Sequence, residues 1–204
     1  MLFSKEDRQS IEAAVRSAES KTAGELVVAH TERADDYAFR RSVVALGLAI
    51  ALGWEALLAL PSVAPVFVLV GQAPAFFLFY WLTGLPPVVR LLVSDAQREV
   101  RTQERAMRAF IEQGVTETRD RSGVLIFIGE AERKVVIVAD KGINDRVEPD
   151  EWRQDVQRIT DGIRAGRAAP GVLESVERIG SLLAEAFPAR ADDENELGDS
   201  VRQL

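Results

Sequence analysis

The residues best able to do chemistry lie in one segment, ADKGINDRVEPDEW, which runs from Ala139 to Trp152. It carries several oxygen-bearing side chains in a short stretch, and a hard cation such as Ca²⁺ or Mg²⁺ binds several such oxygens on a flexible loop. The segment also follows an apolar strand and precedes a helix, a place where α/β proteins hold ligands. The candidate metal ligands are Asp140, Asn144, Asp145 and Asp150. The candidate phosphate contacts are Lys141 and Arg146.

The same segment also allows a structural interpretation. Asp140 can end the strand, Lys141 and Gly142 can turn the chain, and Asp145 can cap a short helix. Acidic residues at helix N-termini are favoured by the helix dipole alone. The ligand spacing is not that of an EF-hand, and no P-loop or aspartyl-phosphatase pattern is present. The sequence favours the structural role and leaves a metal site and catalysis open as alternatives.

Composition narrows the chemistry further. The 204 residues contain no cysteine and a single histidine, so thiolate catalysis, a histidine-based triad and a multi-histidine metal site are excluded. The formal net charge is −7 and no broad stripe of Lys and Arg is present, which argues against a nucleic-acid partner. The one histidine, His30, is expected at a strand end in a structural role.

Three apolar runs predict the strands of a small sheet. The first covers residues 26–29, after a helix that begins with a capping box at Ser4 and Asp7. The other two, at 124–128 and 135–139, are continuous rather than alternating, which indicates strands covered on both faces. Glu25 opens the first strand, and it can meet Asp140 only if that strand is antiparallel to the last one.

Helical periodicity supplies the cover for both faces. One long helix after Ser94 is expected to bury a face made of Ala96, Val100, Met107, Phe110 and Ile111. A second stripe is made of Trp152, Val156, Ile159 and Ile163. A third is made of Leu173, Val176, Ile179, Leu183 and Phe187. These patterns predict one α/β domain whose sheet is covered by helices on both faces.

A two-span membrane hairpin interrupts this fold. Residues 43–60 and 63–82 are apolar all round and each is long enough to cross a bilayer as a helix. A buried pair of core helices is the alternative. Small residues suit close helix packing in the first span, namely Ala45, Gly47, Ala49 and Gly53. Tyr80 and Trp81 suit the interface at one end of the second span.

The flanking arginines predict the orientation of the hairpin. Arg40 and Arg41 precede it and Arg90 follows it, whereas its turn carries no charge. The positive-inside rule places both chain ends in the cytoplasm. Glu55 is the one ionisable side chain between Ser42 and Arg90; we expect it to reach the outer headgroups, and an ion-pathway role is the alternative.

The expected organisation therefore has four parts. Residues 1–40 form the first part of an α/β domain, 41–90 form the transmembrane hairpin, and 91–188 complete the domain. Residues 189–204 are acidic and lack an apolar period, so we expect a flexible tail or a docking peptide.

Several stretches resemble a known family. They are TAGELVV at 22–28, RSGVLIFIGEAERKVVIVADKGI at 121–143, and the later FP and NEL at 187–188 and 195–197. Together they resemble the TPM domain family, and within it the bacterial integral-membrane branch whose domain is split by a membrane hairpin. The resemblance implies a three-layer α/β/α sandwich with a small central mixed sheet, anchored by the hairpin in the bacterial inner membrane. In many relatives the loop after the last strand is Gly-rich with a Glu, whereas here it is KGIND at 141–145.

The resemblance implies two alternative functions. Some relatives are associated with weak phosphatase activity and divalent-metal binding, and others with accessory or assembly roles. The branch is often encoded beside LemA-type membrane proteins, which implies such a partner. We expect a membrane-anchored accessory or scaffolding protein whose cytoplasmic domain binds a protein partner. A metal-dependent phosphatase is the alternative, and the oligomeric state is left open.

Overall fold

The computed structural model describes residues 2–190 and 196–204, except for the side chain of residue 149. The chain divides into two compact units. One unit joins Met1–Ala34 to Glu99–Leu204 and holds the sheet. The other, Asp35–Arg98, holds the two long apolar helices. Each unit is described by itself below.

The sheet of the first unit is mixed and has the strand order β3-β2-β1-β4. Its strands are β1 (Glu25–Thr31), β2 (Gly123–Gly129), β3 (Lys134–Ala139) and β4 (Arg202–Gln203). β2 runs parallel to β1 and antiparallel to β3, so β1 and β3 are antiparallel to each other. Glu25 and Asp140 therefore lie at the same edge of the sheet, the amino-terminal edge of β1 and β2.

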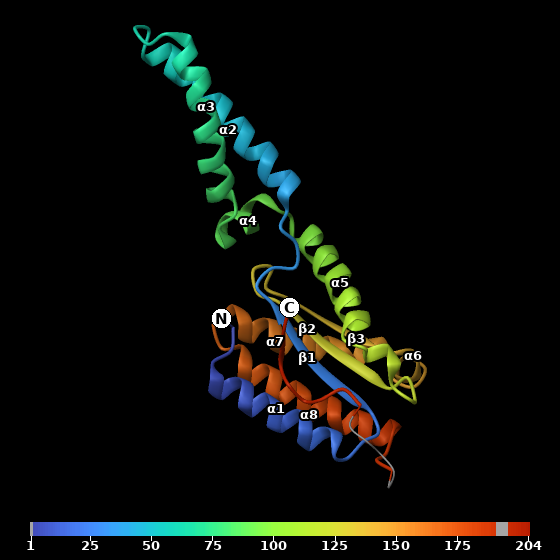
Figure 1. Cartoon of the computed structure of the whole chain (residues 1–204). Coiled ribbons are helices and arrows are strands. Elements are labelled where there is room, and N and C mark those ends of the chain that lie inside the picture. Colours follow the sequence, from blue (N-terminus) through green and yellow to red (C-terminus); the bar gives the residue numbers. More distant parts are fainter. Residues whose placement is uncertain (1, 191–195) are drawn as a thin grey trace. The chain divides into compact units, whose positions relative to one another are not determined.

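Helices cover both faces of this sheet, which confirms the predicted three layers (Figure 1). One face packs on α1 (Lys5–Glu19), α7 (Arg153–Arg164) and α8 (Ala168–Ala186). The other packs on α5 (Asp95–Glu112). The capping box predicted at Ser4 and Asp7 starts α1, with the two reciprocal hydrogen bonds at 3.0 and 2.9 Å.

The buried face of α5 differs from the predicted one. Small and aromatic side chains meet the sheet, namely Thr102, Ala106, Ala109 and Phe110. Val100, Met107 and Ile111 are instead 52%, 48% and 63% exposed. The prediction failed because this helix has two apolar stripes, and periodicity alone does not say which of them meets the sheet. The second stripe is left on the surface of the unit.

The end of the chain also differs from the expected tail. β4 pairs in parallel with β1, Val201 is buried, and the backbone N–H of Leu204 donates to the carbonyl of His30 at 2.9 Å. The side chain of Arg202 donates to that of Gln113 at 2.7 Å. Residues 196–204 are thus part of the fold, whereas residues 191–195 of the expected tail lie outside the described residues.

The second unit contains an antiparallel helical pair, α2 (Ala38–Ala59) and α3 (Pro65–Thr83), followed by the short α4 (Pro86–Leu92). Ala45, Ala49 and Gly53 are the buried residues of α2, in agreement with the role predicted for small residues. A Cβ on Gly53 would lie 2.3 Å from the side-chain nitrogen of Gln72, so the Gln72 side chain of α3 packs directly on this glycine. Gly47 points into open space.

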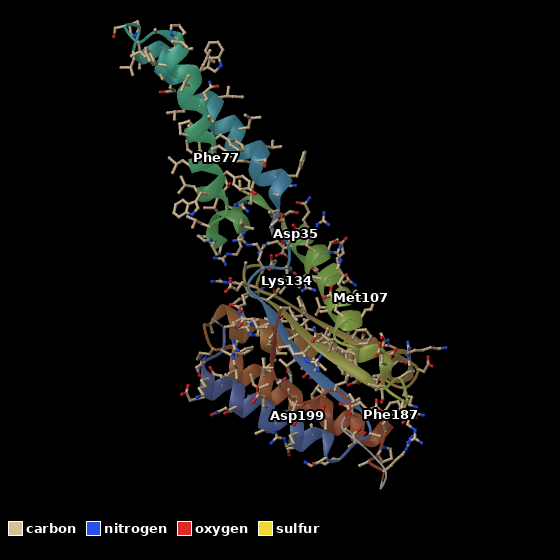
Figure 2. The ribbon with its side chains drawn as sticks, viewed as in Figure 1. Asp35, Phe77, Met107, Lys134, Phe187 and Asp199 are labelled. Carbon is tan, nitrogen blue, oxygen red and sulfur yellow. The ribbon has the colours of Figure 1, made fainter. Side chains whose placement is uncertain are left out.

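Both helices of the pair carry large apolar side chains on their outer surface. Trp54 and Leu58 of α2 are 63% and 81% exposed, and Phe77 and Trp81 of α3 are 69% and 64% exposed. Figure 2 shows such side chains, including the labelled Phe77, projecting from the ribbon of the hairpin. A polar face of the kind that a soluble surface helix presents is missing from both described helices.

The insertion lies in the crossover between the two parallel strands β1 and β2. Parallel neighbours need a long return connection, and α5 supplies the part that packs on the sheet. The chain leaves the first unit just after β1, at Ala34, whose N–H donates to Glu132 at 3.1 Å. It re-joins the unit at Glu99, which pairs with Lys134 at 3.3 Å. Both points lie at the carboxyl edge of β1 and β2, opposite Asp140.

Candidate functional site

Asp140, the first of the predicted ligands, occupies the N-cap of the short helix α6 (Lys141–Asn144). Its Oδ1 accepts a hydrogen bond from the N–H of Lys141 at 2.6 Å. Its Oδ2 lies 2.9 Å from Nε of Arg121, and the carboxylate side chain is only 4% exposed. Both carboxylate oxygens therefore have protein partners that hold the loop in place.

Gly142 allows this loop to pack against the backbone of the segment that precedes β2. Its N–H donates to the carbonyl of Arg121 at 3.0 Å. A Cβ at this position would lie 2.6 Å from the carbonyl oxygen of Asp120 and 2.7 Å from that of Arg121. Only glycine allows so close an approach of two backbone segments. The sequence KGIND thus joins the loop to the segment that precedes β2.

The other predicted ligands are not brought together with Asp140. The side-chain amide of Asn144 donates to the carbonyl of Ala139 at 2.8 Å, and Asp145 is the C-cap of α6. Asp150 lies on the next turn, η2 (Pro149–Trp152), where it pairs with Arg153 at 3.0 Å. Within the described part of the chain, no three carboxylate or imidazole groups converge as metal ligands. In the described structure three of the four side chains have separate local partners rather than one shared site, and metal binding stays a prediction.

Asp145 and Arg146 do line a pocket of about 360 Å³, which we name the amino-edge pocket. Its lining residues are Asp120, Gly142, Asp145, Arg146, Ala186, Phe187, Pro188, Ala189 and Arg190. The guanidinium of Arg146 stacks on the ring of Phe187 at 4.2 Å and donates to the carbonyl of Ala186. Arg190 pairs with Asp120 at 2.8 Å. Lys141 is exposed and is not among the lining residues.

A carboxylate cluster that the sequence reasoning missed lies at the end of α1. The pKa of Glu19 is raised to about 8, mainly by burial; the nearby Glu25 and Asp199 contribute to the rise and the N–H of Leu26 opposes it. That N–H donates to Glu19 at 3.0 Å, and Arg16 pairs with Asp199 at 2.7 Å. The cluster was missed because it depends on the fold of residues 196–204, whose sequence shows no apolar period.

Glu25 belongs to this cluster rather than to the loop of Asp140. It is buried at the start of β1, and its Oε1 accepts from the N–H of Glu196 at 3.0 Å. The N–H of Val201 donates to Glu12 at 3.3 Å. Carboxylates of α1 and β1 thus hold the returning C-terminal segment, which indicates a structural use for these charges.

His30 lies near the opposite edge of the sheet. Its side chain is fully buried, its Nδ1 is 2.7 Å from Oε1 of Glu130, and its ring contacts that of Phe3 edge-on at 5.3 Å. The expected structural role agrees with this packing. In Figure 2 the labelled Lys134 marks that edge, and the labelled Phe187 marks the amino-edge pocket.

A second buried charge also escaped sequence reasoning. Asp155 on α7 is fully buried, and Oδ2 accepts from Nε of Arg178 on α8 at 2.9 Å. Arg158 approaches the other oxygen at 3.0 Å. The hydrogen bond and charge of Asp155 raise the pKa of Arg178. This group ties the two helices together behind the sheet.

Comparison with known proteins agrees with this architecture. Residues 87–182 match the model of the TPM domain family. No curated protein matches the chain significantly. The solved NMR structure of the BA42 protein from the psychrophilic bacterium Bizionia argentinensis is similar to the chain, with a TM-score of 0.62 and 21% sequence identity. The match covers 99% of this chain and 95% of that one, and at this identity it supports the fold alone. Residues 87–182 are therefore similar to the TPM domain family, and the likeness in fold extends over nearly the whole chain.

Proposed function

We propose that this protein is a membrane-anchored accessory or scaffolding protein whose TPM domain binds a protein partner. The observation that carries the proposal is the outer surface of α2 and α3, where large apolar side chains are exposed on every side. A contiguous apolar surface of this kind marks a membrane or protein contact. Two helices with this pattern, each of bilayer length, favour lipid as the covering medium.

The lengths of the helices support a full crossing. At about 1.5 Å per residue, the 22 residues of α2 extend about 33 Å and the 19 residues of α3 about 28 Å. The hydrocarbon core of a bilayer is about 30 Å thick. Arg41 donates to the carbonyl of Tyr80 at 3.0 Å and stacks on its ring, so the arginine-bearing start of α2 lies beside the uncharged end of α3. Arg40 donates to the carbonyl of Leu92 at 2.9 Å.

This gathering of arginines at one end supports a cytoplasmic location for both chain ends. The positive-inside rule retains Lys and Arg on the cytoplasmic side, and the turn at residues 60–64 is uncharged. Glu55 is exposed on α2, four residues before the helix ends at Ala59. In this orientation it lies near the outer headgroups, where its carboxylate can be hydrated. A bacterial inner membrane and a LemA-type partner follow from the family resemblance.

A second candidate function, hydrolysis of phosphate esters, draws support from the amino-edge pocket. Arg146 and Arg190 supply positive charge there, and Asp120 and Asp145 supply carboxylates. Guanidinium groups bind phosphate oxygens well. Asp120 already forms an ion pair with Arg190. We propose no metal-dependent catalytic step for this pocket.

Purification from native membranes tests the preferred function. We expect the same membrane protein to be recovered with the full-length chain in independent preparations and detergents. Repeated isolation without a specific partner would contradict it. Metal-dependent hydrolysis of a generic phosphate ester, lost in Asp145→Asn and Arg146→Ala but kept in the matched surface variant Glu177→Gln, would instead favour the enzyme.

A further inference from the structure

The outer edge of β3 is the feature that points beyond the proposed function. We propose that this edge binds an extended, uncharged segment of the protein partner, which adds to the sheet as a further strand beside β3. The inference rests on the proposed function, because it specifies where and how the TPM domain holds its partner.

The register of the sheet shows which backbone groups are offered. The N–H of Asp140 donates to the carbonyl of Gly123 at 2.9 Å, so this pair is hydrogen-bonded between the strands. Bonded and non-bonded pairs alternate in an antiparallel ladder. Val135, Ile137 and Ala139 therefore direct their N–H and C=O groups away from β2. The amide of Asn144, which bonds the carbonyl of Ala139 from outside, agrees with this direction.

Among the described residues, this edge carries little of the usual protection against strand addition beyond Lys134 and the Asn144 amide on the carbonyl of Ala139. Natural edge strands are blunted by charged side chains, proline, bulges or a covering segment. After Lys134, the strand reads Val-Val-Ile-Val-Ala, without a charge, a proline or a glycine. The opposite edge of the same sheet is paired with the chain's own β4. The edge of β3 is therefore a site for a strand from elsewhere.

A groove runs along this edge between α5 and α7. It has a volume of about 640 Å³ and is lined by Gln103, Met107, Val136, Ile137, Val138, Ala139, Asn144, Trp152, Arg153, Val156 and Gln157. Figure 2 marks Met107 on the α5 wall. Met107 belongs to the exposed stripe of α5, and it is the residue of that stripe that lines the groove.

The chemistry of the groove selects the occupant. Arg153 is the one ionisable residue among those lining it, and it already pairs with Asp150. Successive side chains of an added strand would face α5 and α7 in turn. Each wall carries both apolar and uncharged polar side chains, Gln103 and Met107 on α5 and Val156 and Gln157 on α7, so the groove suits a bound segment without charge. Added strands of this type gain affinity from backbone hydrogen bonds and specificity from such walls.

A second copy of the chain fits the groove less well. A β3–β3 pairing would bring the α5 and α7 walls of one copy against those of the other on each face of the joined sheet. A single extended segment has no such walls and can enter between the helices. We therefore assign the groove to a partner segment and treat self-association as one outcome of the test.

Site-specific photo-crosslinking in native membranes tests this assignment on the full-length chain. A benzophenone side chain is introduced at Gln103 or Gln157, which are exposed on opposite walls, and at Glu177 on α8 as a control. We expect both groove positions to crosslink to one segment of one partner. The control position should give no crosslink to that segment.

Two test variants, each with a control variant, show whether the crosslink depends on strand addition. Ala139→Pro replaces the outward N–H by a ring and should reduce the crosslink at least about tenfold, whereas Ala139→Ser keeps the N–H and the signal. Met107→Glu places a charge in the groove and should reduce the crosslink similarly. Ile111→Glu, on the same stripe but outside the groove lining, should not. Met107 is half-exposed, so this variant keeps the test valid if Ala139→Pro does not fold.

The outcomes separate the inference from the proposed function. Crosslinks from the control position alone, to a partner that still co-purifies, would overturn the groove and leave the proposed function standing. Crosslinks between two copies would assign the edge to self-association instead. A crosslink that is insensitive to both variants would exclude strand addition. Loss of every specific crosslink and of co-purification would contradict both.

Discussion

Glu19 gives the chain a dependence of stability on pH whose sign and size follow from its surroundings. Burial is the main cause of its raised pKa, from 4.5 to about 8, and the charges of Glu25 and Asp199 add to it. Between these two pKa values the folded chain holds a proton that the unfolded chain has released. Because the unfolded state binds fewer protons, the free energy of unfolding falls as the pH rises through this window. The loss is complete above pH 8.

The magnitude follows from the same shift. One pKa unit corresponds to about 1.4 kcal/mol, so the loss has that slope per pH unit in the middle of the window. Between pH 6 and pH 8 it amounts to about 2 kcal/mol, since the slope declines as the pH reaches the folded pKa. Glu19→Gln removes the titration and keeps a side chain of the same size. The variant should lack this part of the pH dependence.

Urea unfolding of the full-length protein in detergent measures this difference. Unfolding is followed for the natural chain and Glu19→Gln at several pH values from 5.5 to 8.5, and the two free energies are subtracted at each pH. The subtraction cancels the contributions of titrating groups that do not interact with Glu19 and leaves those of Glu19 and its coupled neighbours Glu25 and Asp199. We expect the difference to change by about 2 kcal/mol between pH 6 and pH 8. Parallel pH profiles for the two proteins would refute the reasoning about the carboxylate cluster.

Three further predictions concern packing. Arg178→Ala removes one of the two arginines that pair with the buried carboxylate of Asp155 and should lower the free energy of unfolding by about 3–5 kcal/mol. A decrease of less than about 1 kcal/mol would contradict this. Gly180→Ala places a Cβ 2.5 Å from that of Ala18 and should cost about 1–3 kcal/mol of stability, whereas the neighbouring Ser181→Ala should be neutral. Gly53→Leu should separate α2 from α3, because a larger side chain there meets Gln72. The separation is measured with one cysteine introduced into each helix, and we expect the disulfide between them to form less. Unchanged disulfide formation would argue against this contact.

The layers of the fold could be predicted because burial leaves a local pattern. The continuous runs at 124–128 and 135–139 became β2 and β3, and the stripe through Ile159 and Ile163 faces the sheet as expected. The apolar helices of the second unit were equally plain from composition. These features depend on neighbours a few residues apart, which a sequence displays directly.

The strand directions and the end of the chain could not be predicted in the same way. The direction of β1 relative to β3 is fixed by pairing across about a hundred residues, and β4 pairs by backbone bonds that leave no apolar pattern. For α5, two apolar stripes competed, and the small residues Ala106 and Ala109 allow the closer approach to the sheet. The larger side chains stayed outside.

The candidate site shows the same limit. The acidic residues after β3 are close in sequence, but each found a different local partner, such as Arg121 for Asp140 and Arg153 for Asp150. The amino-edge pocket instead gathers residues from three separate segments of the chain. Sequence proximity predicted a shared site, whereas hydrogen bonds to nearby donors distributed these side chains over the loop.

Topology mapping tests the membrane anchor, which is the central claim of this account. The chain has no cysteine, so single cysteines at Ser62 in the hairpin turn and at Glu177 in the TPM domain can each be labelled without background. Intact cells, with the outer membrane made permeable, are treated with a maleimide that does not cross the inner membrane. We expect labelling of Ser62→Cys in these cells and of Glu177→Cys only after the inner membrane is opened. Labelling of Glu177→Cys in intact cells, or protection of both sites until lysis, would contradict a hairpin that crosses the membrane with the domain in the cytoplasm.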